Sequence, residues 1–106
     1  MNNSKETNEA IEEFQILEQQ LRGFLAQKQI VQVELQEIQN ALGELDRTKD
    51  EVYRILSGIM IRTEKNTLKK ELEDKKKLAE LRISSIEKQE KSIEEKTTKL
   101  KEKISS

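Results

Sequence analysis

Apolar residues recur along the first half of the chain at alternating steps of four and three residues, from Ala10 to Leu45. This 3.5-residue period keeps one face of a helix turned toward a partner helix, as in a coiled coil. The pattern predicts a long helix over about 9–47, with a polar segment at 1–8 that we expect to fray. The predicted seam consists of Ala10, Phe14, Leu17, Leu21, Phe24, Lys28, Val31, Leu35, Ile38, Leu42 and Leu45.

A second seam occupies the last third of the chain and predicts another helix over about 66–104, with Asn66 or Thr67 as its cap. Its members are Leu72, Ala79, Ile83, Ile86, Ile93, Thr97, Leu100 and Ile104. Lys28 in the first seam, and Lys76 and Glu90 in the second, break the apolar rule; such residues usually lower stability and fix register. The arms have similar lengths and a short connector, so we expect them to pair antiparallel.

Residues 52–63 differ in character from both arms. β-Branched and aromatic residues gather around Ser57-Gly58, a dipeptide that favours a tight turn. This pattern predicts two strands, about 52–56 and 59–63, that form one hairpin. A lone hairpin is marginal in water, so its apolar side chains and edges need strands from other chains. The residues expected to mediate this oligomerisation are Val52, Tyr53, Ile55, Leu56, Gly58, Ile59, Met60 and Ile61.

Three leucines lie off the seam of the second arm, near the predicted hairpin: Leu68, Leu78 and Leu81. We expect the arm to face more than one neighbour there.

The composition is typical of long solvated helices: 39% of the 106 residues are charged and 33% are hydrophobic. Residues 1–51 carry a net charge of −6 and residues 52–106 a net charge of +5. Opposite charges on antiparallel arms explain this asymmetry more simply than a nucleic-acid site does. The Lys residues of the second arm are interleaved with Glu, and no aromatic residue lies among them to stack on bases. We therefore expect no nucleic-acid partner.

The residue types present make an enzyme unexpected. The chain lacks Cys and His, so the usual bases, nucleophiles and zinc ligands are missing. It has neither a G-x-x-x-x-G-K-[ST] nor a G-x-G-x-x-G motif for phosphates. We expect no catalytic residue, no metal and no cofactor. The longest apolar run, Ile59 to Ile61, is far shorter than a membrane span, and the first residues lack a secretory core. A cytoplasmic protein without membrane contact is expected.

The ends of the two arms opposite the hairpin should leave some apolar surface exposed, because Ile11 and Ile16 lie off the seam. Such surface favours contact with apolar segments of other proteins, although ordinary seam filling explains part of it. The candidate binding residues are Ile11, Phe14, Ile16, Leu17, Ile93, Leu100 and Ile104.

These features together resemble the prefoldin family, specifically its β-type subunit. Leu17-Glu-Gln-Gln-Leu21 and the segment from Ala26 to Leu35 are similar to the first helix of that family. The segment V-Y-R-I-L-S-G-I-M-I-R-T at 52–63 matches its V-Y-K-x-V-G-x-x-x-x-K-T core, and 81–90 is similar too. Ser57 stands where the family usually has glycine, and Gly58 follows.

The resemblance implies an archaeal-like subunit of a hexamer with two α-type and four β-type subunits. In such a hexamer the hairpins form a β-barrel, and the tips of the coiled coils bind non-native polypeptides without ATP. A group II chaperonin then receives the bound protein. The competing hypothesis is a structural coiled-coil spacer or tether that binds no client, for which the hairpin has no purpose.

Overall fold

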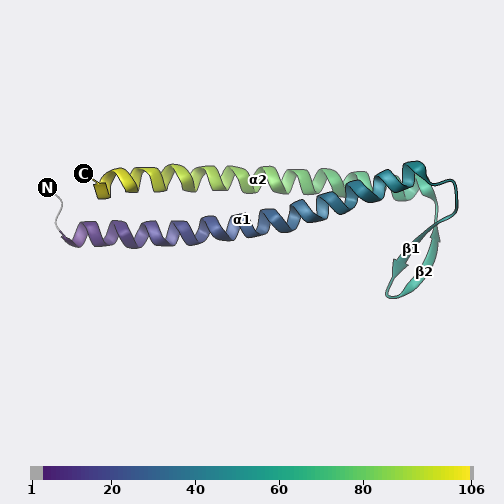
Figure 1. Ribbon diagram of the computed structural model, residues 1–106, viewed down its shortest axis with the longest axis horizontal. Helices are drawn as coiled ribbons and strands as arrows, with labels where there is room; N and C mark the ends of the chain where they lie inside the picture. Colours follow the sequence, from purple (N-terminus) through teal and green to yellow (C-terminus); the bar gives the residue numbers. More distant parts are fainter. Residues whose placement is uncertain (1–3, 106) are drawn as a thin grey trace. The chain divides into compact units, whose positions relative to one another are not determined.

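The computed structural model describes residues 4–105, in the order helix, strand, strand, helix (Figure 1). Helix α1 spans Ser4–Arg47, strand β1 Val52–Leu56, strand β2 Ile59–Thr63 and helix α2 Lys65–Ser105. The expected mostly helical fold, with one short β-hairpin between two long helices, is confirmed. Neither described helix is apolar enough over a sufficient length to cross a bilayer.

The chain divides into two compact units. The terminal unit comprises Met1–Ile30 and Ile83–Ser106, and the hairpin unit comprises Val31–Arg82. Each is described by itself below, and the organisation of residues 1–106 as one domain stays a prediction.

In the terminal unit the two helices pack antiparallel through the seams expected from the sequence. Ala10 and Leu17 of α1 and Ile86 and Ile93 of α2 are buried. Phe14 lies beside Lys101, whereas Lys28 lies beside Glu90, so α2 runs opposite to α1. Burial of these apolar side chains stabilises the pair, at roughly 25 cal/mol for each Å² removed from water.

The hairpin unit contains the same helix pairing together with the β-hairpin. Val31 and Leu45 of α1 and Ala79 of α2 are buried. Lys69 Nζ lies 3.2 Å from Asp46 Oδ1, again with the helices antiparallel. Lys65 Nζ donates to the carbonyl oxygen of Thr48 at 3.0 Å, which ties the start of α2 to the end of α1.

The two strands pair from Val52↔Thr63 to Leu56↔Ile59, joined by the two-residue loop Ser57-Gly58. Both loop residues have positive φ, 50° for Ser57 and 78° for Gly58. Positive φ at both positions is characteristic of a type I′ turn, whose twist matches that of antiparallel strands. A glycine at position 58, one residue later than expected from the family pattern, is therefore compatible with a tight hairpin.

The helix starts differ from those expected. α1 begins at Ser4 and includes residues expected to fray; residues 1–3 of that segment lie outside the described residues. Residues 4–8 contain neither Gly nor Pro, and Glu6 in the first turn interacts favourably with the helix dipole. α2 begins at Lys65, so neither Asn66 nor Thr67 caps it; the backbone carbonyl of Glu64 instead accepts from the amide of Leu68 at 3.0 Å.

Candidate interaction surfaces

The hairpin presents apolar side chains on both of its faces. Because directly paired residues share a face, Tyr53, Ile55, Met60 and Arg62 lie on one side. Ile55 is 70% exposed and its partner Met60 is 65% exposed. The opposite face carries Val52, Arg54, Leu56, Ile59, Ile61 and Thr63.

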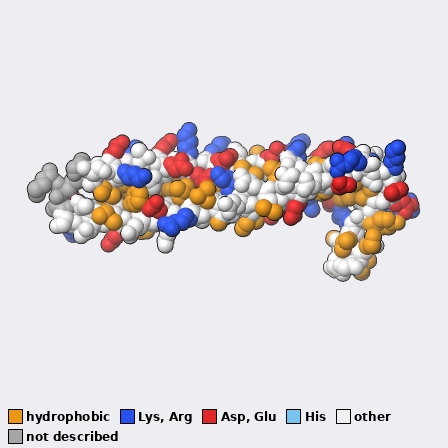
Figure 2. All heavy atoms as spheres, viewed as in Figure 1, with side chains coloured by type: hydrophobic (Ala, Val, Ile, Leu, Met, Phe, Trp, Pro, Cys, Tyr) orange, Lys and Arg blue, Asp and Glu red, His pale blue; other side chains and the backbone are white. Residues whose placement is uncertain are grey.

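Little of this apolar surface is covered. Leu56, Ile59 and Ile61 on the opposite face are exposed, and only Val52, among the expected hydrophobic hairpin residues, is half-buried. Figure 2 shows hydrophobic side chains gathered over the hairpin. Such a cluster of large apolar side chains is typical of a surface that another chain covers.

Both strands also have an unpaired outer edge, because the sheet formed by the described residues has only two strands. Free strand edges present unpaired N–H and C=O groups that can extend a ladder with another strand. The hairpin thus offers apolar faces and open edges in one element of ten strand residues.

A polar cluster at the base of the hairpin links its two strands. The carboxylate of Glu51 accepts from the Tyr53 hydroxyl at 2.8 Å and lies 2.9 Å from Nη2 of Arg62. The hydrogen bond to Glu51, followed by the charge of that carboxylate, raises the pKa of Tyr53 above its usual value of 10.0. Tyr53 is therefore held neutral as a hydrogen-bond donor.

On the opposite face, Arg54 of β1 forms an ion pair with Glu71 of α2. Both side chains are partly buried, and the pair holds the hairpin against the first turns of α2. The hairpin is consequently connected to the helices by a side-chain contact as well as by its two short loops.

In the terminal unit, the candidate binding residues differ in accessibility. Ile11 and Ile16 are exposed, Ile16 to 55%. They are five residues apart, about 140° around the helix, so they form two separate apolar spots. Phe14, Leu100 and Ile104 are half-buried, whereas Leu17 and Ile93 are buried in the seam. A ligand could reach Leu17 and Ile93 only if the helices separated.

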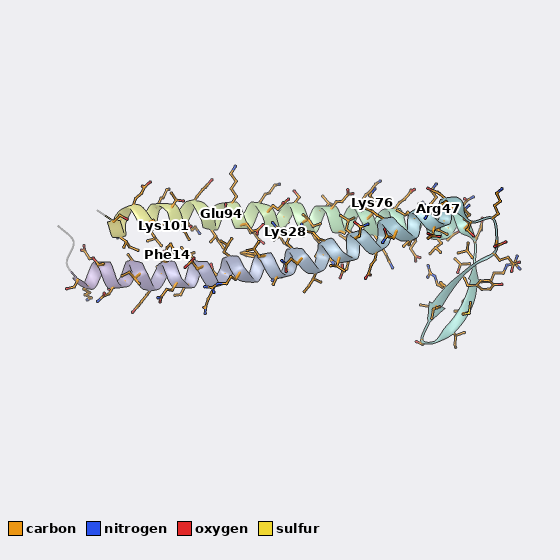
Figure 3. The ribbon with its side chains drawn as sticks, in the orientation of Figure 1. Phe14, Lys28, Arg47, Lys76, Glu94 and Lys101 are labelled. Atoms are coloured by element: carbon orange, nitrogen blue, oxygen red, sulfur yellow. The ribbon has the colours of Figure 1, made fainter. Side chains whose placement is uncertain are left out.

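Phe14 also has a polar neighbour from the other helix. The Nζ atom of Lys101 lies 5.7 Å from the centroid of the Phe14 ring, a cation–π contact (Figure 3). This contact covers part of the ring with a side chain that is itself exposed. The ring is therefore accessible to an apolar ligand once the flexible lysine moves.

The polar seam residues Lys28 and Glu90 turn out to be partners. Lys28 Nζ donates to Glu90 Oε1 at 2.7 Å, and Glu90 is only 6% exposed. Glu87 lies further away, with 3.9 Å between its Oε2 and Lys28 Nζ. The hydrogen bond to Glu90 raises the pKa of Lys28 above its usual value of 10.5. Seam periodicity marked both residues as exceptions, but pairing them required the relative register of the helices.

The described residues contain no group of three carboxylates placed to hold a metal ion. A hollow along α2 in the terminal unit is lined by charged and hydroxyl side chains of that one helix: Lys91, Glu94, Glu95, Thr98, Lys99 and Glu102. Such a surface suits solvent better than a substrate, because catalysis needs a partly dry, concave site.

The network around Glu51 and the Arg54–Glu71 pair were not expected from the sequence. Alternation along the strands could have placed Tyr53 and Arg62 on one face, since they pair directly. The position of Glu51 beside them depends on the conformation of the loop after α1. A loop has no sequence periodicity from which its conformation could be predicted.

Comparison with known proteins is consistent across sequence and structure. Residues 8–106 match the family model described as prefoldin subunit. Prefoldin subunit beta of Sulfurisphaera tokodaii is 34% identical over 92 residues, which is 85% of this chain and 74% of that protein. Prefoldin subunit beta of Thermococcus onnurineus is 35% identical over 89 residues, covering 82% and 77% of the two chains.

A solved structure gives the same result. The crystal structure of the prefoldin beta subunit from Thermococcus strain KS-1 superposes with a TM-score of 0.90 at 30% identity. The match covers 97% of this chain and 92% of that one.

Proposed function

The chain belongs to the prefoldin subunit family, and we propose that it is a β-type chaperone subunit that binds non-native proteins without ATP. The observation that carries this proposal is the hairpin with two apolar faces and two open edges. Such a subunit is stabilised when strands of other chains cover its apolar faces and pair with its open edges. We further propose that the protein acts in the cytoplasm and has no enzymatic activity of its own.

Assembly through the hairpin is the first part of the proposal. Strands of several subunits would pair edge to edge into a closed barrel, which leaves no free edge. We propose the family arrangement of two α-type and four β-type subunits, in which this chain supplies β-type copies. Exposed Ile55 and Met60 on one face, and Leu56 and Ile59 on the other, would then be covered by neighbouring strands and elements.

Client binding at the ends of the arms is the second part. The exposed Ile11 and Ile16 are the first contacts, with the half-buried Phe14, Leu100 and Ile104 beside the seam. Leu17 and Ile93 would add to binding only where the helices part. Each buried side chain contributes about 1.5–3 kcal/mol, so a single arm binds weakly. Several arms on one assembly hold a client through avidity, and release one contact at a time.

We propose that the bound polypeptide passes to a group II chaperonin. A holding surface made of small, weak apolar contacts is suited to transfer, because no single contact has to be broken against a large barrier. The chain has no phosphate-binding motif, so the proposal involves no nucleotide cycle.

Substitution of Ile16 tests the client-binding proposal. Ile16→Ser should weaken the suppression of aggregation of an unfolding protein such as heat-treated citrate synthase. Ile30→Ser is a matched control, because Ile30 is also exposed in α1 and lies two heptads away at the same heptad position. Light scattering of the client, with and without each variant, measures the effect.

Equal loss of protection in both variants would contradict the proposed location of the binding surface. Complete lack of protection by the unchanged chain, alone and mixed with an α-type subunit, would favour a structural spacer. In that case light scattering of the chain itself should give the mass of a simple dimer.

A further inference from the structure

Two apolar side chains of α1 adjoin at the margin of the seam in the terminal unit. Ile11 and Phe14 are three residues apart, so they lie next to each other on the helix surface. Ile11 is 38% exposed, and the Phe14 ring is half-buried. An apolar ligand that reaches the ring therefore also contacts Ile11.

The lysine beside this surface has no carboxylate partner within residues 4–105. The Nζ atom of Lys101 lies 5.7 Å from the centroid of the Phe14 ring, and the two side chains come from facing helices (Figure 3). None of the ion pairs among these residues includes Lys101. Glu102 follows it in sequence, but consecutive helix side chains do not face each other. The positions three and four residues away are all uncharged: Thr97, Thr98, Ile104 and Ser105. The exposed ammonium group can therefore pair with a carboxylate of another molecule.

Carboxylates of the chain itself stand further along the same side of each helix, towards Lys28. Glu18 follows Ile11 by seven residues on α1, and Glu94 precedes Lys101 by seven residues on α2. Residues seven apart share one side of a helix, and both glutamates are exposed. A ligand carboxylate is therefore attracted beside Phe14 and repelled one to two turns away from it.

We propose that Lys101 makes the client-binding surface selective for apolar segments that carry a carboxylate next to the apolar side chain. The apolar side chain covers Ile11 and the Phe14 ring, and the displaced ammonium group of Lys101 pairs with the neighbouring carboxylate. The lysine thus exchanges a cation–π contact for an ion pair, and its charge keeps a partner throughout. This inference rests on the client binding described under the proposed function, and it names the class of polypeptide segment that is bound.

The selectivity of one arm is modest, because Lys101 is exposed to solvent. An ion pair at an exposed site changes an affinity by at most about fivefold. Salt screens such a pair, so the preference is largest at low ionic strength. A segment with a lysine beside its apolar side chain meets the opposite effect, since two ammonium groups repel each other.

Fluorescence anisotropy of labelled peptides tests this selectivity. Three peptides share one apolar core around a central phenylalanine and differ only in its neighbour, which is aspartate, asparagine or lysine. The full chain, alone and assembled with an α-type subunit, is titrated onto each peptide at low ionic strength. The aspartate peptide should bind up to about fivefold more tightly than the asparagine peptide, and the lysine peptide more weakly than both. Lys101→Gln should remove these differences and largely preserve binding of the asparagine peptide, whereas Lys101→Arg should retain them.

Lys99→Gln is the matched control, because it removes the same charge about 200° around α2 from Lys101. Glu95 and Glu102 lie four and three residues from Lys99, and this variant should keep the preference. A preference that persists in Lys101→Gln, or that is lost equally in Lys99→Gln, would overturn the role of Lys101. Equal binding of all three peptides by the unchanged chain would overturn the selectivity and leave client binding intact. Binding of none of them, by the chain alone or assembled, would contradict both.

Discussion

Lys28 of α1 and Glu90 of α2 form a hydrogen-bonded ion pair inside the seam of the terminal unit, with 2.7 Å between Nζ and Oε1. Apolar seams tolerate shifts by one heptad, since Leu and Ile replace one another at similar positions. A buried carboxylate without its cation is costly, so only one register satisfies both residues. The pair therefore specifies how the two helices align.

Removal of Lys28 should destabilise the terminal unit. Lys28→Met leaves Glu90 buried without its cation, and the melting temperature should fall by on the order of 10 °C. Thermal unfolding followed by circular dichroism measures this change. Lys91→Met serves as the control, since Lys91 is exposed on α2 next to Glu90 and should have little effect.

Replacement of both partners should behave differently. A chain with Lys28→Leu and Glu90→Leu should be at least as stable as the original, because well-packed apolar residues often replace a buried ion pair without loss. A double variant as unstable as Lys28→Met would contradict this account of the pair.

The Lys28–Glu90 pair also gives the terminal unit a dependence on alkaline pH. Its hydrogen bond raises the pKa of Lys28 in the folded chain above 10.5, the usual value expected on unfolding. The stabilisation is therefore complete well below pH 10.5 and is lost as the pH rises through the folded pKa. As the pH rises above 10.5, the melting temperature should therefore fall more in the original chain than in the variant with leucine at positions 28 and 90.

Titration of Tyr53 can be observed without interference, because it is the only tyrosine and the chain has no tryptophan. Its tyrosinate absorbance near ~295 nm should appear with a midpoint above the ordinary pKa of about 10. Glu51→Gln should lower the pKa of Tyr53, since it removes the carboxylate that raises it. Glu64→Gln removes a different carboxylate, one that follows the second strand and is not the acceptor of the Tyr53 hydroxyl, and it should leave the midpoint unchanged. An equal shift in both variants would rule out the Glu51 contact.

Truncation of a buried seam residue should cost far more than a neighbouring surface change. Ile86→Ala removes most of a side chain that is buried in the terminal unit, and should lower the free energy of unfolding by about 2–4 kcal/mol. Ser85→Ala, an exposed change one residue away, should stay within about 0.5 kcal/mol of the original. Urea unfolding measures both, and similar losses would argue against the observed helix pairing.

The turn at Ser57-Gly58 predicts opposite effects for two substitutions. Ser57→Asn should stabilise the hairpin by up to about 1 kcal/mol, because Asn tolerates positive φ better than Ser. Gly58→Ala should destabilise it by about 1 kcal/mol through backbone strain alone, since no atom lies within 4 Å of an added Cβ. Amide hydrogen exchange of the strand residues measures the stability of the hairpin in each variant. Slower exchange in the Gly58→Ala variant than in the original chain would exclude a type I′ turn.

Much of this fold follows from periodicity in the sequence. The steps of four and three residues placed Leu17 and Val31 in the seam, and both are buried. The change to β-branched residues around Ser57-Gly58 placed the hairpin. Heptad spacing and turn residues are patterns within a short stretch of sequence. Such patterns determine the two helices and the hairpin, which make up most of the fold.

Helix starts and side-chain partners followed less directly. Asn66 was a plausible cap by residue type, but α2 starts one residue earlier, where Lys65 reaches the carbonyl of Thr48 across the connection. Lys28 and Glu90 are 62 positions apart in the sequence, and they meet only because the chain returns antiparallel in one register. The solvent accessibility of Leu17 likewise depends on contacts with the opposite helix. The hydrophobic pattern of a single helix does not specify those contacts.

The hairpin with two open edges makes the stability of this region a property of the solution as well as of the chain. Two strands alone are barely stable in water, and each additional strand from another molecule shifts the balance toward the ordered form. Mass action therefore links order in residues 52–63 to the number of subunits per volume. A melting temperature measured for this protein acquires its meaning only together with the concentration at which it was recorded.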